Sequence, residues 1–148
     1  MRSLYDNLGV QTSVIAQSDS GGSAVNGSSV DTKGYNTAVI RGRAEAASGS
    51  PTAASTVYKL QESADGSTGW ADALDNTGVV IGFTLNPKTA AAEGLARIEG
   101  LGLNRKRYLR VVETTTFTAG TTPAVLVFGE ILLGRGFQRP TNSATSNT

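Results

Sequence analysis

The sequence contains no cysteine and no histidine among its 148 residues. Without cysteine, disulfide bonds and thiolate metal sites are excluded, and the redox compartment of the protein stays open. Without histidine, the chain lacks the commonest general base and the commonest metal ligand. Neither a Ser–His nor a Cys–His catalytic pair can form, so an enzymatic function has little support in the composition.

Excess charge and long hydrophobic runs are also missing. The 13 Lys and Arg residues nearly balance the 12 Asp and Glu residues, for a net charge of +1, which gives no overall attraction to nucleic acid or to an anionic membrane. The longest apolar stretch, PAVLVFGEILLG at residues 123–134, is interrupted by Glu130 and is too short to cross a bilayer. The opening MRSLYDNLGV has no apolar segment of the kind found in secretory signals. We therefore expect a soluble protein, made in the cytoplasm, that binds neither nucleic acid nor membrane.

Glycine is frequent, with 18 residues, and Ser, Thr and Ala are abundant, which favours short strands and turns over long helices. Strands are predicted at residues 9–17, 29–44 (two short strands around a Lys-Gly pair), 56–63, 78–85, 94–100, 106–115 and 124–134. Seven or eight short strands at this spacing predict an all-β, single-domain β-sandwich of the jelly-roll kind, with the strand order left open.

Two of these strands carry a specific expectation. In the strand at 56–63, Tyr58 and Leu60 fall on the face opposite Lys59, because side chains alternate along a strand. The strand at 124–134 is apolar on both faces, which is typical of a strand in the middle of a packed sheet.

Local signals predict two tight turns and one helical turn. Asn26-Gly27 and Asp65-Gly66 are both pairs that favour tight turns. An Asn-Pro pair followed by alanines predicts a helical turn over residues 86–93.

The chain divides by composition into three parts: an extended N-terminal arm at residues 1–8, the β-sandwich domain at residues 9–135, and a flexible C-terminal tail at residues 136–148. The tail is polar and lacks the apolar content to fold alone.

No pattern indicates catalysis, a cofactor or a metal. Asp72 and Asp75 lie in a turn-rich segment where solvated acids are common, so they are a weak candidate for a catalytic carboxylate pair. The glycine-rich SDSGGSAVNG lacks the GK[ST] ending of a phosphate-binding loop. The Asp-Gly-Ser turn at residues 65–67 lacks the spacing of a calcium-binding loop. We predict that the protein is not an enzyme and has no catalytic residue, cofactor or metal site.

The basic run RKRYLRVV at residues 105–112 combines four cations with apolar residues. On a strand, one face would carry Arg105, Arg107, Leu109 and Val111, and the other Lys106, Tyr108, Arg110 and Val112. Because the cations are divided between two faces, a nucleic-acid surface is disfavoured. The interpretations left open are pairing with acids such as Glu62 or Glu113, contact with an acidic partner protein, and a solvated strand end.

Three stretches share the pattern of a known group: SAVNGSSVDTKGYNTAVI at residues 23–40, YKLQESADGSTGWADA at 58–73 and NRKRYLRVVETT at 104–115. The opening MRSLYDNLGV also fits. The sequence resembles the small capsid cement, or decoration, proteins that tailed bacteriophages encode beside the major capsid protein. The resemblance covers most of residues 1–135, and its motifs combine a strand with a turn rather than catalytic groups. The Ala- and Ser-rich residues 45–55 and the tail depart from the pattern.

This resemblance implies a β-sandwich on the outside of an icosahedral shell, where it bridges capsid subunits against internal DNA pressure. The implied partners are the major capsid protein and neighbouring copies of the chain, as a homotrimer or homodimer, and the implied location is the outer capsid surface of the virion. Extended arms and strand edges suit such contacts, and repetition over the shell supplies avidity. The alternative is a head-exposed module that recognises host-surface glycans.

Candidate capsid contacts lie mainly in the ends of the chain, where the alternative is a frayed terminus. The candidates are Arg2, Leu4, Tyr5, Leu8, Arg105, Arg107, Phe137 and Arg139. Phe137 is either a contact with a neighbour or a last core residue. Trp70, the single tryptophan, is expected to pack in the core, with an exposed binding ring as the alternative.

Overall fold

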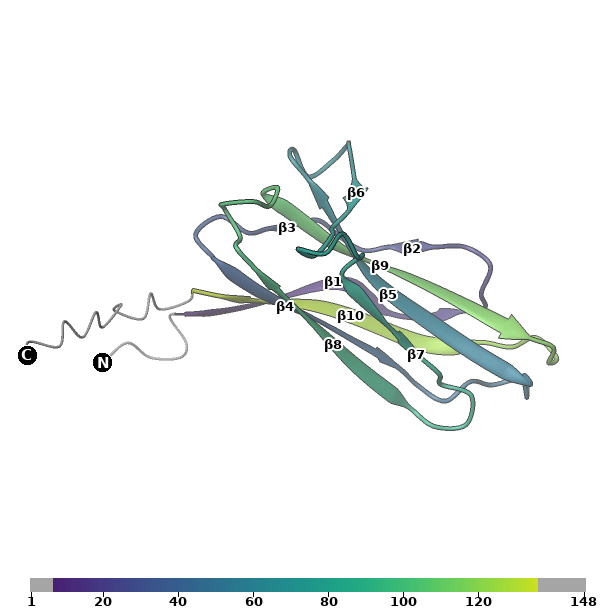
Figure 1. Ribbon diagram of the computed structural model, residues 1–148. Coiled ribbons are helices and arrows are strands. Elements are labelled where there is room, and N and C mark those ends of the chain that lie inside the picture. Colours follow the sequence, from purple (N-terminus) through teal and green to yellow (C-terminus); the bar gives the residue numbers. More distant parts are fainter. Residues whose placement is uncertain (1–6, 136–148) are drawn as a thin grey trace, which may run out of the picture.

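The computed structural model describes residues 7–135, which form the strands β1 to β10 and no helix (Figure 1). The strands make two antiparallel sheets that lie one over the other. The expected all-β sandwich is therefore confirmed. Within this part of the chain, no helix is long and apolar enough to span a membrane.

The first sheet, sheet A, has the strand order β1–β10–β4–β8. Its strands are β1 (Leu8–Asp19), β10 (Val125–Gly134), β4 (Thr37–Ala44) and β8 (Ala92–Glu99). As predicted from its two apolar faces, β10 lies inside the sheet, between β1 and β4. Ile131 and Leu133 are buried between the sheets, whereas Leu132 on the outer face is half-buried.

The second sheet, sheet B, is built on the long pair β5 and β9. Its main order is β2 (Val25–Asn26), β9 (Tyr108–Thr118), β5 (Ala53–Ser63) and β6 (Ala71–Asp72), and the short strands β3 (Val30–Asp31) and β7 (Gly82–Leu85) pair with β9 and β5 respectively. Because the strands at both edges are short, most of the outer surface of this sheet is formed by β5 and β9.

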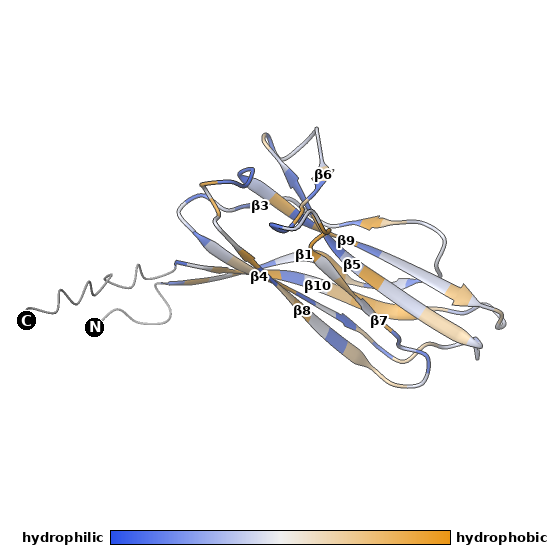
Figure 2. Cartoon of the chain, in the orientation of Figure 1, coloured by the Kyte–Doolittle hydropathy of each residue, from blue (hydrophilic) through white to orange (hydrophobic). Residues whose placement is uncertain are grey.

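The core lies between the two sheets and follows the alternation of side chains along each strand. In β5, Tyr58 and Leu60 are fully buried while Lys59 stays partly exposed, as the sequence predicts. Ile40 of β4 and Ile131 of β10 close the core from sheet A. Figure 2 shows hydrophobic stretches recurring along β5, β9 and β10.

The two sheets come into close contact where Tyr58 faces Gly42 of β4. A Cβ atom on Gly42 would lie 2.8 Å from atoms of the Tyr58 ring, so the ring fills the space that a side chain would take. The Tyr58 hydroxyl donates a hydrogen bond to the carbonyl oxygen of Arg43 at 2.7 Å, and its ring stacks on Phe83 at 5.3 Å between centroids. Glycine is therefore required at position 42 by the packing of the sheets rather than by a turn.

The helical turn predicted over residues 86–93 is wrong. Residues 86–91 are a loop in which the Pro87 carbonyl accepts the Ala47 N–H at 2.8 Å, and β8 begins at Ala92. The small residues Ala92 and Gly94 turn toward the core because β8 pairs along its length with β4. Tertiary pairing thus overrides the helical preference of alanine.

The tight turn predicted at Asn26-Gly27 is also wrong. Asn26 belongs to β2, and the Gly27 N–H donates to the Val111 carbonyl at 2.9 Å as the chain continues along β9. The reversal lies earlier, where Gly21 and Gly22 take positive φ angles of 83° and 92°. Asp65-Gly66 does form the expected turn, with a φ of 76° at Gly66.

The described chain begins and ends at the same end of the sandwich (Figure 1). The Arg135 N–H donates a hydrogen bond to the Asn7 carbonyl oxygen at 2.9 Å, so the first and last described residues are bonded neighbours. The Arg135 guanidinium lies over the Tyr35 ring at 5.5 Å from its centroid. The residues next to which the expected arm and tail begin, Asn7 and Arg135, are therefore neighbours in space.

Candidate functional site

The basic run reaches the outer face of sheet B at the start of β9. Because β9 begins at Tyr108, the predicted alternation holds only from that residue onward. Leu109 and Val111 are buried toward the core, and Tyr108 and Arg110 lie on the outer face. The cations at positions 105–107 precede the strand and belong to neither face.

Arg107 forms a bidentate ion pair with an acid of the neighbouring strand β3. Its Nε and Nη2 atoms donate to the two carboxylate oxygens of Asp31 at 2.8 and 2.6 Å, and its guanidinium lies 5.1 Å from the centroid of the Tyr108 ring. This bidentate pair lowers the pKa of Asp31 to about 2. Arg107 remains about half exposed, so it is still accessible to a partner.

Arg105 has a different environment. Its guanidinium donates to the Leu74 carbonyl oxygen and lies 4.0 Å from the Glu62 carboxylate, and only 13% of its side chain is exposed. The backbone N–H of Lys106 donates to the same Glu62 carboxylate at 3.3 Å. Of the two acids proposed as partners, Glu62 is therefore correct. Arg105 anchors the loop around Leu74 to the start of β9.

Glu113, the other proposed partner, points into the core and contacts none of these cations in the described structure. It is fully buried, and its Oε1 accepts a hydrogen bond from the Thr115 hydroxyl at 2.6 Å. Its Oε2 and the Oδ2 of Asp19, a residue that is 8% exposed, have no hydrogen-bond partner within residues 7–135. Burial raises the pKa of Glu113 to about 7, and the neighbouring Asp19 carboxylate adds to this shift. Sequence reasoning missed this pair, although the alternation in β9 does place Glu113 inward.

The main polar cluster on sheet B is a chain of bonded side chains on β9, β5 and β6. Arg110 donates to the Gln61 Oε1 through Nε at 3.0 Å and Nη2 at 2.7 Å, and the Gln61 Nε2 donates to Asp72 at 2.8 Å. Lys59 donates to the Asp72 carboxylate at 2.9 to 3.0 Å. The bonds from Gln61 and Lys59 lower the pKa of Asp72, and burial lowers the pKa of Arg110.

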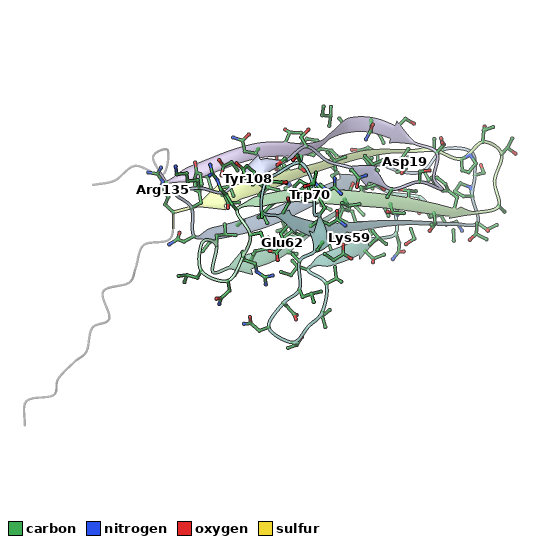
Figure 3. All side chains as sticks on the ribbon, turned by 90° about the horizontal axis from the view of Figure 1, so that it is seen from above. Asp19, Lys59, Glu62, Trp70, Tyr108 and Arg135 are labelled. Atoms are coloured by element: carbon green, nitrogen blue, oxygen red, sulfur yellow. The ribbon has the colours of Figure 1, made fainter. Side chains whose placement is uncertain are left out.

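Trp70 lies beside this chain and not in the core, contrary to the expectation from the sequence. The Arg110 guanidinium lies 4.4 Å from the centroid of the indole ring, and Trp70 as a whole is half-buried. The Arg110 guanidinium contacts the indole ring on the outer face of sheet B, so the ring is partly shielded from solvent without packing between the sheets. We call Lys59, Gln61, Trp70, Asp72 and Arg110 the Trp70 cluster. Figure 3 shows Trp70 between Tyr108 and Lys59 along the length of the sandwich.

The loop before Trp70 is held in shape by Asp65. Its carboxylate accepts the backbone N–H groups of Ser67 and Thr68 at 2.9 and 2.8 Å and the Thr68 hydroxyl at 2.6 Å. These bonds, the one from the Thr68 hydroxyl first, hold the pKa of Asp65 far below its usual range. Gly66 approaches the Tyr108 ring so closely that a Cβ atom would lie 2.8 Å from it. The loop therefore packs against Tyr108, and it positions Trp70 next to sheet B.

Next to the Trp70 cluster, the surface is hollowed. A cavity of about 390 Å³ has Lys59 and Asp72 on one side and Val57, Val80 and Phe83 among its apolar lining residues. Its size is within the usual range of small-molecule sites.

The remaining predicted contact residues fall at or beyond the ends of the described chain. Leu8 is the first residue of β1, so it belongs to the sandwich and not to the arm, and it is 43% exposed. The other candidates lie outside residues 7–135: Arg2, Leu4, Tyr5, Phe137 and Arg139. Among the described residues, no group of three or more acids is placed to hold a metal ion.

Comparison with known proteins gives distant structural similarities. No protein-family model matches the chain, and no curated protein matches it. Among solved structures, the SPBc2 prophage-derived protein YomS is 16% identical with a TM-score of 0.41, over 85% of this chain and 93% of that one. The CBM22-1 xylan-binding domain of Xyn10C from Paenibacillus barcinonensis is 9% identical with a TM-score of 0.40, over 88% and 87%. Similarities at these levels do not indicate a function for this chain.

Proposed function

We propose that the protein is a structural subunit of a tailed-bacteriophage virion that decorates the outside of the capsid. It binds the major capsid protein, joins neighbouring subunits and stabilises the shell against internal DNA pressure. It performs this role by adhesion, without a catalytic step, after synthesis in the host cytoplasm.

The observation that carries the proposal is the common exit of both chain ends. The hydrogen bond between Arg135 and Asn7 joins the last and the first described residues, to which the proposed tail and arm are attached. The contact candidates Tyr5 and Phe137 lie within two residues of this bonded pair along the sequence. Because both segments leave from one end, they can reach the same capsid surface together while the sandwich stands away from it. Two linked contacts bind more strongly than either one alone.

The test is cosedimentation of the purified protein with empty expanded capsids. We expect the protein to pellet with the shells at a fixed ratio and to raise the temperature at which they disrupt. Removal of residues 1–6 is expected to weaken this binding at least about ten-fold. The deletion ends before Asn7, so β1 stays paired with β10 and the melting temperature is expected to change little.

A matched control is removal of residues 141–148, which keeps Phe137 and Arg139 and is expected to leave capsid binding unchanged. If the protein lacking residues 1–6 decorates shells as well as the full chain does, the arm has no role in attachment. If the full chain does not pellet with shells at all, the decoration function is wrong.

A second candidate function is recognition of host-surface glycans by the exposed part of the sandwich. One observation favours it: a half-buried tryptophan lies beside a row of hydrogen-bonding side chains on the outer face of sheet B. The two functions are compatible, since attachment through the chain ends leaves the sides of the sandwich free.

A further inference from the structure

We propose that the Trp70 cluster is a binding site for a neutral saccharide. The inference develops the second candidate function, on which it rests, and is independent of capsid attachment. It identifies the residues of the site, the chemical class of the ligand and the reason for that class.

The first requirement of such a site is a flat apolar surface. A sugar ring presents C–H groups on its faces, and an aromatic ring is a suitable surface for them. Trp70 as a whole is half-buried on the outer side of sheet B, and the guanidinium of Arg110 lies 4.4 Å from the centroid of its ring. Because β6 begins at the next residue and pairs with β5, the indole is held by a sheet rather than by a free loop.

The second requirement is a set of donors and acceptors beside that surface, since each sugar hydroxyl both donates and accepts. Asp72 offers carboxylate oxygens, Lys59 offers ammonium N–H groups, and Gln61 offers an amide that bonds on both sides. These side chains already hold one another in place. Little conformational entropy is therefore lost when a ligand binds.

The third observation is the charge balance of this face, which selects a neutral ligand. Lys59 in the cluster and two cations beside the face are each paired with an acid: the pairs are Lys59–Asp72, Arg107–Asp31 and Arg105–Glu62. Arg110 bonds to the neutral Gln61 amide and lies over an aromatic ring. A polyanion such as a nucleic acid requires a larger surplus of positive charge than that of the Trp70 cluster, where Arg110 is the one cation bonded to a neutral group instead of an acid.

The cavity beside Asp72 would allow the site to contact more than one sugar unit. It holds about 390 Å³, and its walls combine the Lys59–Asp72 pair with the apolar side chains of Val57 and Val80. A sugar unit in the cavity would reach Asp72 from one side while the next unit lies against Trp70. The arrangement fits a short oligosaccharide better than a single sugar.

The test begins with the unmodified protein, because Trp70 is the only tryptophan in the chain. Binding is screened against an array that carries neutral oligosaccharides (glucans, xylans, galactans and mannans) together with sialylated and sulfated glycans. The best neutral ligand is then titrated while tryptophan emission and acrylamide quenching are measured. We expect a saturable change in emission and a reduced quenching constant. Binding of the acidic glycans alone, or no response to any neutral glycan, would overturn the proposal.

Substitutions then locate the site. Gln61→Ala and Trp70→Ala are expected to weaken binding at least about ten-fold. Thr116→Ala is the control, because Thr116 lies on the same face of β9 away from the cluster and is exposed. If Gln61→Ala and Trp70→Ala bind the oligosaccharide as the wild type does, the Trp70 cluster is not the site.

Cosedimentation with capsids separates this proposal from the capsid proposal. Gln61→Ala is expected to pellet with shells like the wild type, because Gln61 lies on the outer face of sheet B, away from the paired chain ends. Loss of saccharide binding with retained decoration supports both proposals.

Discussion

At the scale of single residues, Glu113 makes the stability of the protein depend on pH. Its pKa rises from 4.5 to about 7 on folding, so between these values the folded state holds a proton that the unfolded state has lost. The stability from this group is complete below pH 4.5 and is lost as the pH rises to about 7, with a total of about 3 kcal/mol. The neighbouring Asp19 carboxylate also acts against the ionisation of Glu113.

Glu113→Gln is therefore expected to gain stability over the wild type as the pH rises. Glutamine has the shape of the protonated acid and carries no charge, so the difference in the free energy of unfolding should be small at pH 4.5 and reach about 3 kcal/mol at pH 8. Urea unfolding across this pH range measures it. The control is Glu45→Gln, an exposed partner of Arg43, for which a change of less than about 1 kcal/mol is expected at every pH. An equal effect of Glu113→Gln at both pH values would contradict the assignment.

Gly42 is the second residue with a specific energetic role. Gly42→Ala should lower the free energy of unfolding by about 1–3 kcal/mol, because the new methyl group would overlap the fixed ring of Tyr58. Thermal unfolding measures the loss. In a Tyr58→Leu background the same substitution should cost less, since the overlapping ring is gone. An unchanged cost in that background would show that the Tyr58 ring is not the cause.

At the scale of elements, the 64–69 loop determines how Trp70 meets sheet B. Asp65→Ala removes the acceptor of several hydrogen bonds in this loop, so Trp70 is expected to become more accessible to acrylamide, with a quenching constant about two-fold higher. Ser67→Ala is the matched control, because Ser67 contributes its backbone N–H, which alanine keeps. If Asp65→Ala quenches like the wild type, the loop does not position the indole.

The strands whose own pattern decides their place could be predicted from the sequence. The alternation in β5 and the two apolar faces of β10 each lead to the observed arrangement. The start of β8 could not be predicted, because Ala92 and Glu93 belong to the strand only through their pairing with β4. Trp70 was misplaced for a similar reason: its cover comes from Arg110, a residue distant in the sequence. A local sequence pattern does not show which distant segments will pair or contact each other.

At the scale of the whole molecule, we expect the proposed contact with a second copy of the chain to use the outer face of sheet A. It exposes Val10, Leu95 and Leu126, each at least half exposed. Between them, Arg41 and Arg43 both bond to Glu93, so two such faces can approach with their charges already matched. This is consistent with the homotrimer or homodimer proposed for the capsid surface.

Leu95→Glu is accordingly expected to reduce self-association, measured as the molar mass in light scattering across a range of protein concentrations. A charge at the centre of an apolar contact costs binding free energy, whereas the same change outside the contact is neutral. Leu103→Glu is the control, because Leu103 is 85% exposed in the loop after β8. Equal effects of the two substitutions would exclude sheet A as the contact surface.

The hydrogen bond between Arg135 and Asn7 also makes the sandwich suitable for display. Since the chain enters and leaves at one pole, the connection between β9 and β10 lies at the opposite pole, where residues 119–122 are exposed (Figure 1). A foreign peptide inserted there would project outward from any particle to which the ends are fastened, on a rigid support one sandwich long.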